Sequence, residues 1–256
     1  MKEQTVTQNQ SYRLITIPIS HYCEKARWAL DWLQFPYIEE PHVPLFHRWA
    51  TLRHAGKSVP VLVTSEGALV DSTDILRYLN AKRNSDRQLY PDDRMLRRQI
   101  DELEELFDRK LGVSTRCWVY FYRLKDKESM RRAWCQGTPE KEQLGFDLGF
   151  PIISLIVKKN LQITPDAAKA ALQEIKQIFA TVSAQLEDGR RYLVGNEFSA
   201  ADLTFAALSA PVLLPPEHPI KVSKIEDLDR EMRTTVEQLR MTPAGEFALR
   251  LYRENR

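Results

Sequence analysis

Long apolar runs are missing from this sequence. Stretches such as FPIISLIV, residues 150–157, fall far short of the roughly 20 apolar residues that a membrane-spanning helix needs. The first residues, MKEQTVTQNQS, are polar and do not resemble a secretory signal. We therefore expect a soluble, cytoplasmic protein with no membrane partner.

Cysteine and histidine are also scarce, and the chain has no marked excess of either charge. The three cysteines are odd in number and widely spaced, and the five histidines are scattered. This pattern supports neither a disulfide framework nor a zinc site. The 37 basic and 35 acidic residues nearly balance, whereas nucleic-acid-binding proteins usually show a basic excess or a basic stripe. We expect no metal, no nucleic-acid partner and a reducing compartment.

The first third of the chain alternates short apolar runs with helical periodicity. The segment YRLITIPI, residues 12–19, is typical of a strand because it is short and rich in Ile and Thr. From Cys23 onward the apolar residues recur at helical spacing. A second extended segment in PYIEEPHV, a hairpin around TSEG and a helix in DSTDILRYLNAKR follow. The predicted order is β-α-β-(α)-β-β-α.

Helical patterns dominate after LYPDD, residues 89–93. Apolar residues from Leu96 to Phe121 step by three or four over about seven turns, and further helices are predicted within 165–187, 199–210, 225–240 and 243–253. We predict a mixed α/β domain over residues 1–87, with a flexible extension at 1–11, and an all-helical domain over residues 88–256. Residues 126–165 give no clear pattern, and GFDLGFP, residues 145–151, predicts a loop.

The segment ISHYCEKARWAL places Ser20 and Cys23 where a strand gives way to a helix. The unpaired N–H groups of a first helical turn favour negative charge, so a hydroxyl or thiol there can stabilise or become a thiolate. The structural alternative is that Ser20 only caps the helix and Cys23 packs as a small hydrophobic residue. The residues alone leave both interpretations open.

Three further motifs have fixed places along the predicted elements. In SVPVL, Pro60 falls at the start of a strand, where a residue without an N–H is tolerated. In DSTDIL, Ser72 is predicted as an N-cap, and the N–H groups behind it can hold a carboxylate. In FSAADL, Ser199 and Asp202 form a variant of the capping box, which we interpret as a folding device rather than a site.

The order of these motifs resembles that of the cytosolic glutathione transferase family. SHYCEKARWAL is similar to the family's Ser- or Cys-type activating segment, GKSVPVL to its cis-proline segment and DSTDIL to its Glu/Asp-Ser motif. FSAADLTFA is similar to the capping box of its helical domain. Thr16 occupies the position, four residues before Ser20, at which the family's Tyr-type classes carry their catalytic tyrosine. Catalysis by a tyrosine is therefore not expected. The resemblance implies a thioredoxin-like N-terminal domain followed by an all-helical domain.

The resemblance also implies how glutathione, as a co-substrate and with no other cofactor, is held. Ser20 would donate a hydrogen bond to its sulfur, with Cys23 as the alternative catalytic residue. Ser72 would hold the γ-glutamyl carboxylate and Asp71 would face the ammonium group. Lys57 would reach the glycyl carboxylate. The implied glutathione-binding residues are Lys57, Val59, Pro60, Asp71 and Ser72.

A second substrate, a small hydrophobic electrophile, is expected between the domains in this family. The implied walls are the segment after Pro18, the C-terminus and one stretch of the long helix. The predicted residues of that stretch are Leu111, Ser114, Thr115 and Trp118. The resemblance and the long helix of mixed polarity predict a homodimer.

Three functions remain open from the sequence. The leading hypothesis is a Ser-type glutathione transferase that conjugates glutathione to electrophiles in detoxification, with peroxidase activity as a further reaction. The second is a glutathione-dependent thiol-disulfide oxidoreductase acting through Cys23. The third is a non-catalytic relative that binds ligands or proteins, because a fold does not fix a function.

Overall fold

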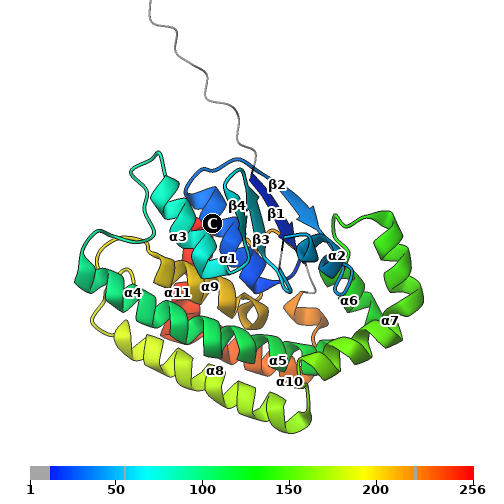
Figure 1. Ribbon diagram of the computed structural model, residues 1–256. Coiled ribbons are helices and arrows are strands. Elements are labelled where there is room, and N and C mark those ends of the chain that lie inside the picture. The colour runs from blue at the N-terminus through cyan, green and yellow to red at the C-terminus, as the bar shows by residue number, and fades with distance from the viewer. Residues whose placement is uncertain (1–11, 55, 222–223) are drawn as a thin grey trace, which may run out of the picture.

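A computed structural model describes residues 12–54, 56–221 and 224–256 (Figure 1). The predicted extension at residues 1–11 lies outside these ranges. The N-terminal domain has its strands and helices in the predicted order. Its elements are β1 (Tyr12–Thr16), α1 (His21–Trp32), β2 (Tyr37–Pro41), α2 (His47–Leu52), β3 (Val61–Thr64), β4 (Gly67–Leu69) and α3 (Ser72–Lys82).

The four strands form one mixed sheet in the order β2-β1-β3-β4. Strands β1 and β2 run parallel, with Tyr12 opposite Tyr37, while β1 and β3 run antiparallel, with Leu14 opposite Leu62. Strands β3 and β4 form the predicted antiparallel hairpin. The parallel pair needs a crossover, which α1 supplies. The predicted thioredoxin-like fold class is confirmed.

Buried apolar side chains explain why α1 and α3 pack on the sheet. Ala26 and Leu30 of α1, and Ile75 and Leu79 of α3, have no exposed surface, in agreement with their helical spacing. Helix α1 contacts α3 and also α9 (Ala200–Leu213) of the second domain. The first helix therefore connects the sheet to the helical domain, and its N-terminal residues lie near the boundary between the two.

The second domain is helical throughout, as predicted. Figure 1 shows α4 and α5 as one long helix running past the N-terminal domain, with α8 alongside α5. In the described part of the chain, no helix is both long and apolar enough to span a membrane. The elements besides α9 are α4 (Arg94–Leu106), a π-helical segment (Phe107–Leu111), α5 (Gly112–Arg123), α6 (Lys127–Trp134), α7 (Glu140–Asn160), α8 (Pro165–Gln185), a 3₁₀ turn (Ile225–Asp227), α10 (Arg230–Arg240) and α11 (Pro243–Asn255).

The predicted loop at residues 145–151 is wrong, because this segment lies inside α7. Proline inside a helix removes one N–H and frees the carbonyl four residues earlier. At Pro151 that carbonyl belongs to Asp147, and it accepts a hydrogen bond from Lys127 Nζ at 2.8 Å. A Cβ on Gly145 would lie 2.5 Å from Phe46 Cζ, so close packing against Phe46 requires a glycine there. Tertiary contacts override the local breaker signal.

The capping box that the sequence predicts at α9 is present. Ser199 N donates to Asp202 Oδ2 at 2.8 Å, and Ser199 Oγ donates to the same oxygen at 2.7 Å. Asp202 Oδ1 also accepts the N–H of Leu193 at 2.7 Å, and the whole Asp202 side chain is buried. These contacts satisfy backbone groups in the core, so the motif acts in folding, as interpreted from the sequence.

Candidate active site

Ser20 is the N-cap of α1. Its backbone is extended, with φ −62° and ψ 119°, and its Oγ accepts the N–H of Cys23 at 3.4 Å. The side chain is half-buried and faces the larger of two cavities between the domains. Because Oγ accepts from the helix, the hydroxyl hydrogen remains available to donate to a group in that cavity. Capping and thiol activation are therefore compatible roles for one residue.

Cys23 is fully buried on the apolar side of α1. Burial raises the pKa of the Cys23 thiol to about 11, against smaller lowering effects from Arg27 and Ser20. A thiol with this pKa is protonated at neutral pH, and a protonated thiol is a poor nucleophile. Of the two residues that the sequence left open, the accessible one is Ser20.

The loop before β3 closes the cavity near Ser20. The bond between Val59 and Pro60 is cis, as the family resemblance implies. Lys57 and Val59 line the larger cavity together with Ser20, while Val59 and Pro60 also line a smaller neighbouring cavity. The predicted loop residues therefore lie where the two cavities meet.

Helix α3 begins one residue earlier than expected, because its N-cap is Asp71 and not Ser72. Asp71 Oδ1 accepts the N–H groups of Thr73 at 2.8 Å and Asp74 at 3.3 Å. Ser72 is instead the first helical residue and is buried. Both Asp71 and Ser72 line the smaller cavity of about 640 Å³, so the structure brings them together with Val59 and Pro60.

A buried ionic cluster that the sequence did not predict borders the smaller cavity through Thr73, Glu104 and Asp108. Lys25 Nζ lies 2.8 Å from Glu104 Oε1, 2.7 Å from Asp108 Oδ2 and 2.9 Å from Thr73 Oγ1. Tyr90 Oη donates to Glu104 Oε2 at 2.7 Å. Lys25 belongs to α1, whereas the two acids belong to α4 and the π-helical segment, so the cluster joins the domains. No spacing rule indicates that these charges are buried.

The π-helical segment places Asp108 beside the smaller cavity. Its Oδ2 contacts Lys25 and Thr73, whereas its Oδ1 is buried and has no hydrogen-bond partner among the described residues. Burial, stronger than the opposing effect of Lys25, raises the pKa of Asp108 above its usual value. Single π-helical turns occur often at functional sites. The Asp108 carboxyl group therefore borders the smaller cavity and has one oxygen without a hydrogen bond.

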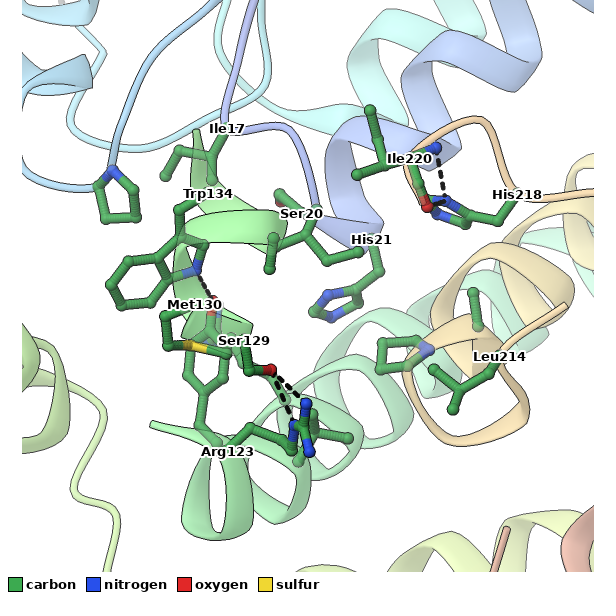
Figure 2. Close-up of a pocket in the computed structure, with 18 of the residues that line it drawn as sticks. Ile17, Ser20, His21, Arg123, Ser129, Met130, Trp134, Leu214, His218 and Ile220 are labelled. Carbon is green, nitrogen blue, oxygen red and sulfur yellow. Dashed lines mark hydrogen bonds between the residues drawn. The ribbon is translucent and has the colours of Figure 1, made fainter. Parts of the chain in front are cut away.

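The larger cavity has a volume of about 740 Å³ and apolar walls from both domains. Figure 2 shows Ser20 and His21 at the start of α1 facing this space, with Met130 and Trp134 of α6 on one side. Leu214 and the segment after α9 lie on the other side. A cavity of this size whose wall surface is mostly apolar is suited to a small hydrophobic molecule.

The predicted second-substrate residues are on the wrong face of the long helix. Leu111, Ser114, Thr115 and Trp118 are buried in the core, and none of them lines either cavity. Thr115 Oγ1, for example, donates to Leu208 O at 2.9 Å. The residues of α5 that line the larger cavity are Arg116, Val119, Tyr120 and Arg123. Both sets repeat at helical spacing, so periodicity alone could not distinguish the cavity face from the core face.

His21 follows Ser20 and stays neutral. Burial, followed by the positive charge of Arg116, lowers the pKa of His21 to about 3. Its Nε2 donates to Gly112 O at 2.8 Å, which ties α1 to α5. With this pKa the imidazole is uncharged near pH 7, and its Nε2 hydrogen is used in the contact with Gly112.

Comparison with known proteins identifies the family. The family model described as the N-terminal domain of glutathione S-transferase matches residues 14–87, and the model of the C-terminal domain matches residues 147–216. Together the two models match more than half of the chain, which therefore belongs to the glutathione S-transferase family. A search of curated proteins finds no match to the sequence.

Solved structures show the same fold at low identity. A glutathione S-transferase from Methylobacterium radiotolerans in complex with glutathione sulfonate matches with a TM-score of 0.55 and 20% identity, over 93% of this chain and 94% of that one. The beta-etherase LigF from Sphingobium sp. strain SYK-6 matches with a TM-score of 0.60 and 16% identity, over 94% and 99%. These likenesses support the fold alone.

Proposed function

We propose that this protein is a glutathione transferase in which Ser20 activates the glutathione thiol for attack on a small hydrophobic electrophile. The observation that carries the proposal is the half-exposed Ser20 hydroxyl at the start of α1, directed at an apolar cavity of about 740 Å³. Cys23, the competing nucleophile, is fully buried with a raised pKa.

Glutathione would lie across the junction of the two cavities. Its γ-glutamyl carboxylate would bind Ser72, the first residue of α3, at the positive end of that helix. Its ammonium group would face Asp71 and Asp108, both of which line the smaller cavity. Its cysteinyl part would meet Val59, and its glycyl carboxylate would lie near Lys57. This orientation brings the sulfur to the Ser20 hydroxyl.

Thiol activation follows from one hydrogen bond. A charge-assisted hydrogen bond contributes about 1.5–3 kcal/mol, and about 1.4 kcal/mol corresponds to one pKa unit. A donor that binds the thiolate only would lower a thiol pKa of about 8.5 by roughly one to two units. At pH 7 the ionised fraction would then rise from about 3% to between roughly 30% and 80%. The thiolate forms a carbon–sulfur bond with the electrophile, and the leaving group departs with its electron pair.

The same thiolate also supports a peroxidase reaction. Its attack on a hydroperoxide would give a glutathione sulfenic acid and an alcohol, and a second glutathione would convert the sulfenic acid to glutathione disulfide and water. No residue besides Ser20 is required for this chemistry, so it remains a further activity of the same site rather than a separate function.

One experiment separates the enzymatic proposal from its alternatives. We expect the protein to bind glutathione in calorimetry and to conjugate it to chlorodinitrobenzene. A thiol-disulfide oxidoreductase would instead form a mixed disulfide with glutathione that Cys23→Ala abolishes. A non-catalytic relative would bind a hydrophobic ligand but show no conjugation above the uncatalysed rate. Either of the last two results would overturn the proposal.

We also propose that the protein is a homodimer. Helix α4 and the start of α5 expose the apolar side chains of Met95 (68%) and Val113 (45%), and a second subunit related by a two-fold axis would cover both. Light scattering should give twice the chain mass of 29.8 kDa at micromolar concentration. A monomeric mass at that concentration would contradict this.

A further inference from the structure

The walls of the larger cavity are mostly apolar, and the charged side chains among them are nearly all positive. Of the described residues that line it, seven are arginine or lysine and one, Glu226, is acidic. The whole chain has almost equal numbers of basic and acidic residues, so this imbalance is local. A hydrophobic cavity bordered by positive charge favours a ligand that combines an apolar body with an anionic group.

Several of these cations already have partners. Arg123 Nε donates to Ser129 Oγ at 2.9 Å, and its Nη2 lies 3.7 Å from Asp126 Oδ2. Arg240 Nη1 donates to Leu213 O at 2.5 Å. Lys221 Nζ donates to Pro216 O at 2.8 Å. These contacts stabilise the walls, so the side chains concerned are not the first candidates for a ligand.

Arg116 differs from these cations in its surroundings. It is half-buried on α5, and among the described residues it forms no ion pair. Its guanidinium lies 5.9 Å from the centre of the Tyr22 ring, and it lines the larger cavity together with Val119 and Tyr120. A partly desolvated guanidinium beside one aromatic ring retains its capacity for a two-point contact with a carboxylate.

The position of Arg116 also indicates which anion it would meet. It lines both cavities, so it lies at their junction beside Tyr22. The two carboxylates of glutathione have other partners in the proposed orientation, at Ser72 with the N-terminus of α3 and at Lys57. The free capacity of Arg116 is therefore left for the second substrate.

We propose that the second substrate is a hydrophobic electrophile that carries a carboxylate, and that Arg116 binds this group. The inference rests on the proposed conjugation of glutathione and makes its second substrate more specific. The carboxylate takes no part in the covalent step. With an aryl chloride, the glutathione sulfur forms a bond to the ring carbon and chloride leaves with the bonding electron pair. Arg116 fixes the ring so that this carbon faces the sulfur.

The test compares a chloro-dinitrobenzoate with its methyl ester, which differ in the charge of one group. Each kcat/KM is divided by the uncatalysed rate constant, because the ester is intrinsically more reactive. We expect the wild type to prefer the acid and Arg116→Gln to lower the acid-to-ester ratio by about 10- to 100-fold. Arg116→Lys should give an intermediate ratio. The matched control is Arg132→Gln, a surface residue of α6 paired with Glu128 and absent from both cavities.

Two outcomes would overturn the inference. An unchanged acid-to-ester ratio in Arg116→Gln would show that Arg116 does not bind the carboxylate of the substrate. An equal loss for acid and ester, with a raised pKa of bound glutathione, would show that Arg116 acts on the thiolate instead. Thermal unfolding of each variant separates these results from misfolding.

A binding measurement keeps the inference testable if conjugation itself is absent. Calorimetry with dinitrobenzoate and its methyl ester, neither of which carries a leaving group, should show tighter binding of the acid that Arg116→Gln removes. Loss of this preference with no conjugation by the wild type would refute the proposed function but support the anion site. Equal binding of acid and ester by the wild type would refute the anion site.

Discussion

Replacing Lys25 with methionine tests the buried cluster that joins the two domains. Lys25 is fully buried, and its Nζ lies within 2.9 Å of Glu104, Asp108 and Thr73. Methionine nearly preserves the volume but removes the charge, so Glu104 and Asp108 remain in the interior without their cation. The perturbation therefore isolates electrostatics from packing.

The expected cost is large compared with the stability of a typical domain. Removing one partner of a buried ion pair costs about 3–5 kcal/mol, while whole proteins unfold with about 5–15 kcal/mol. Burial already raises the pKa of Asp108 with Lys25 present, and loss of Lys25 raises it further. In the variant, the folded state then binds protons more readily than the unfolded state, so stability falls as the pH rises. The deficit should be greatest near neutral pH and should shrink in acid.

Urea unfolding followed by circular dichroism at neutral and acidic pH measures this effect. Adding Glu104→Gln and Asp108→Asn to Lys25→Met should restore part of the lost stability, because the uncompensated charges are gone. The control is Lys110→Met, whose exposed amine lies 3.8 Å from Glu174, and it should change the free energy of unfolding by less than about 1 kcal/mol. A Lys25→Met variant as stable as the control would refute the reasoning.

Three other predictions concern the site and its supports. Ser72→Ala should raise the KM for glutathione about tenfold, because a charge-assisted contact is lost, and should have little effect on thiol activation. An unchanged KM in steady-state kinetics would place the γ-glutamyl site elsewhere. Gly112→Ala should cost about 1–3 kcal/mol in thermal unfolding and weaken glutathione binding, because its Cβ would lie 2.5 Å from Tyr22 Oη; wild-type values would contradict this. His42 Nδ1 lies 2.7 Å from Glu142 Oε1, and this hydrogen bond raises the pKa of His42. The stability that this pair contributes is fully present below the unfolded pKa of 6.5 and is lost as the pH rises through the folded pKa of His42. Glu142→Gln should therefore flatten the decline in melting temperature above about pH 6.5. An unchanged slope would show that the His42–Glu142 pair does not cause the decline.

Local motifs made the fold, and the grouping of some residues at the candidate site, predictable. Cys23 and Leu30 fall on one side of a helix in the sequence, and both are fully buried in the structure. The Val-Pro and Asp-Ser motifs are informative because of their order along the chain. The structure brings Val59 and Ser72 to the same small cavity. Such features depend on neighbours within a few residues, so the sequence contains them directly.

Features that depend on distant contacts were not predictable. Which face of α5 borders the cavity depends on where α6 and the segment after α9 lie, so Arg116 could not be distinguished from Trp118 by spacing. The helical state of residues 145–151 depends on Phe46 and Lys127, which are far away in the sequence. The burial of Lys25 likewise depends on two acids of the second domain.

The pKa of enzyme-bound glutathione in three proteins tests the central claim most directly. The measurement is the ultraviolet absorbance of the thiolate against pH, together with the pH profile of kcat/KM, for the wild type, Ser20→Ala and Cys23→Ala. We predict a lowered pKa in the wild type and in Cys23→Ala. In Ser20→Ala the pKa should return toward the free value of about 8.5, with a roughly 10- to 30-fold loss of ionised thiol at pH 7. A lowered pKa and full activity in Ser20→Ala, with an inactive Cys23→Ala, would contradict the account.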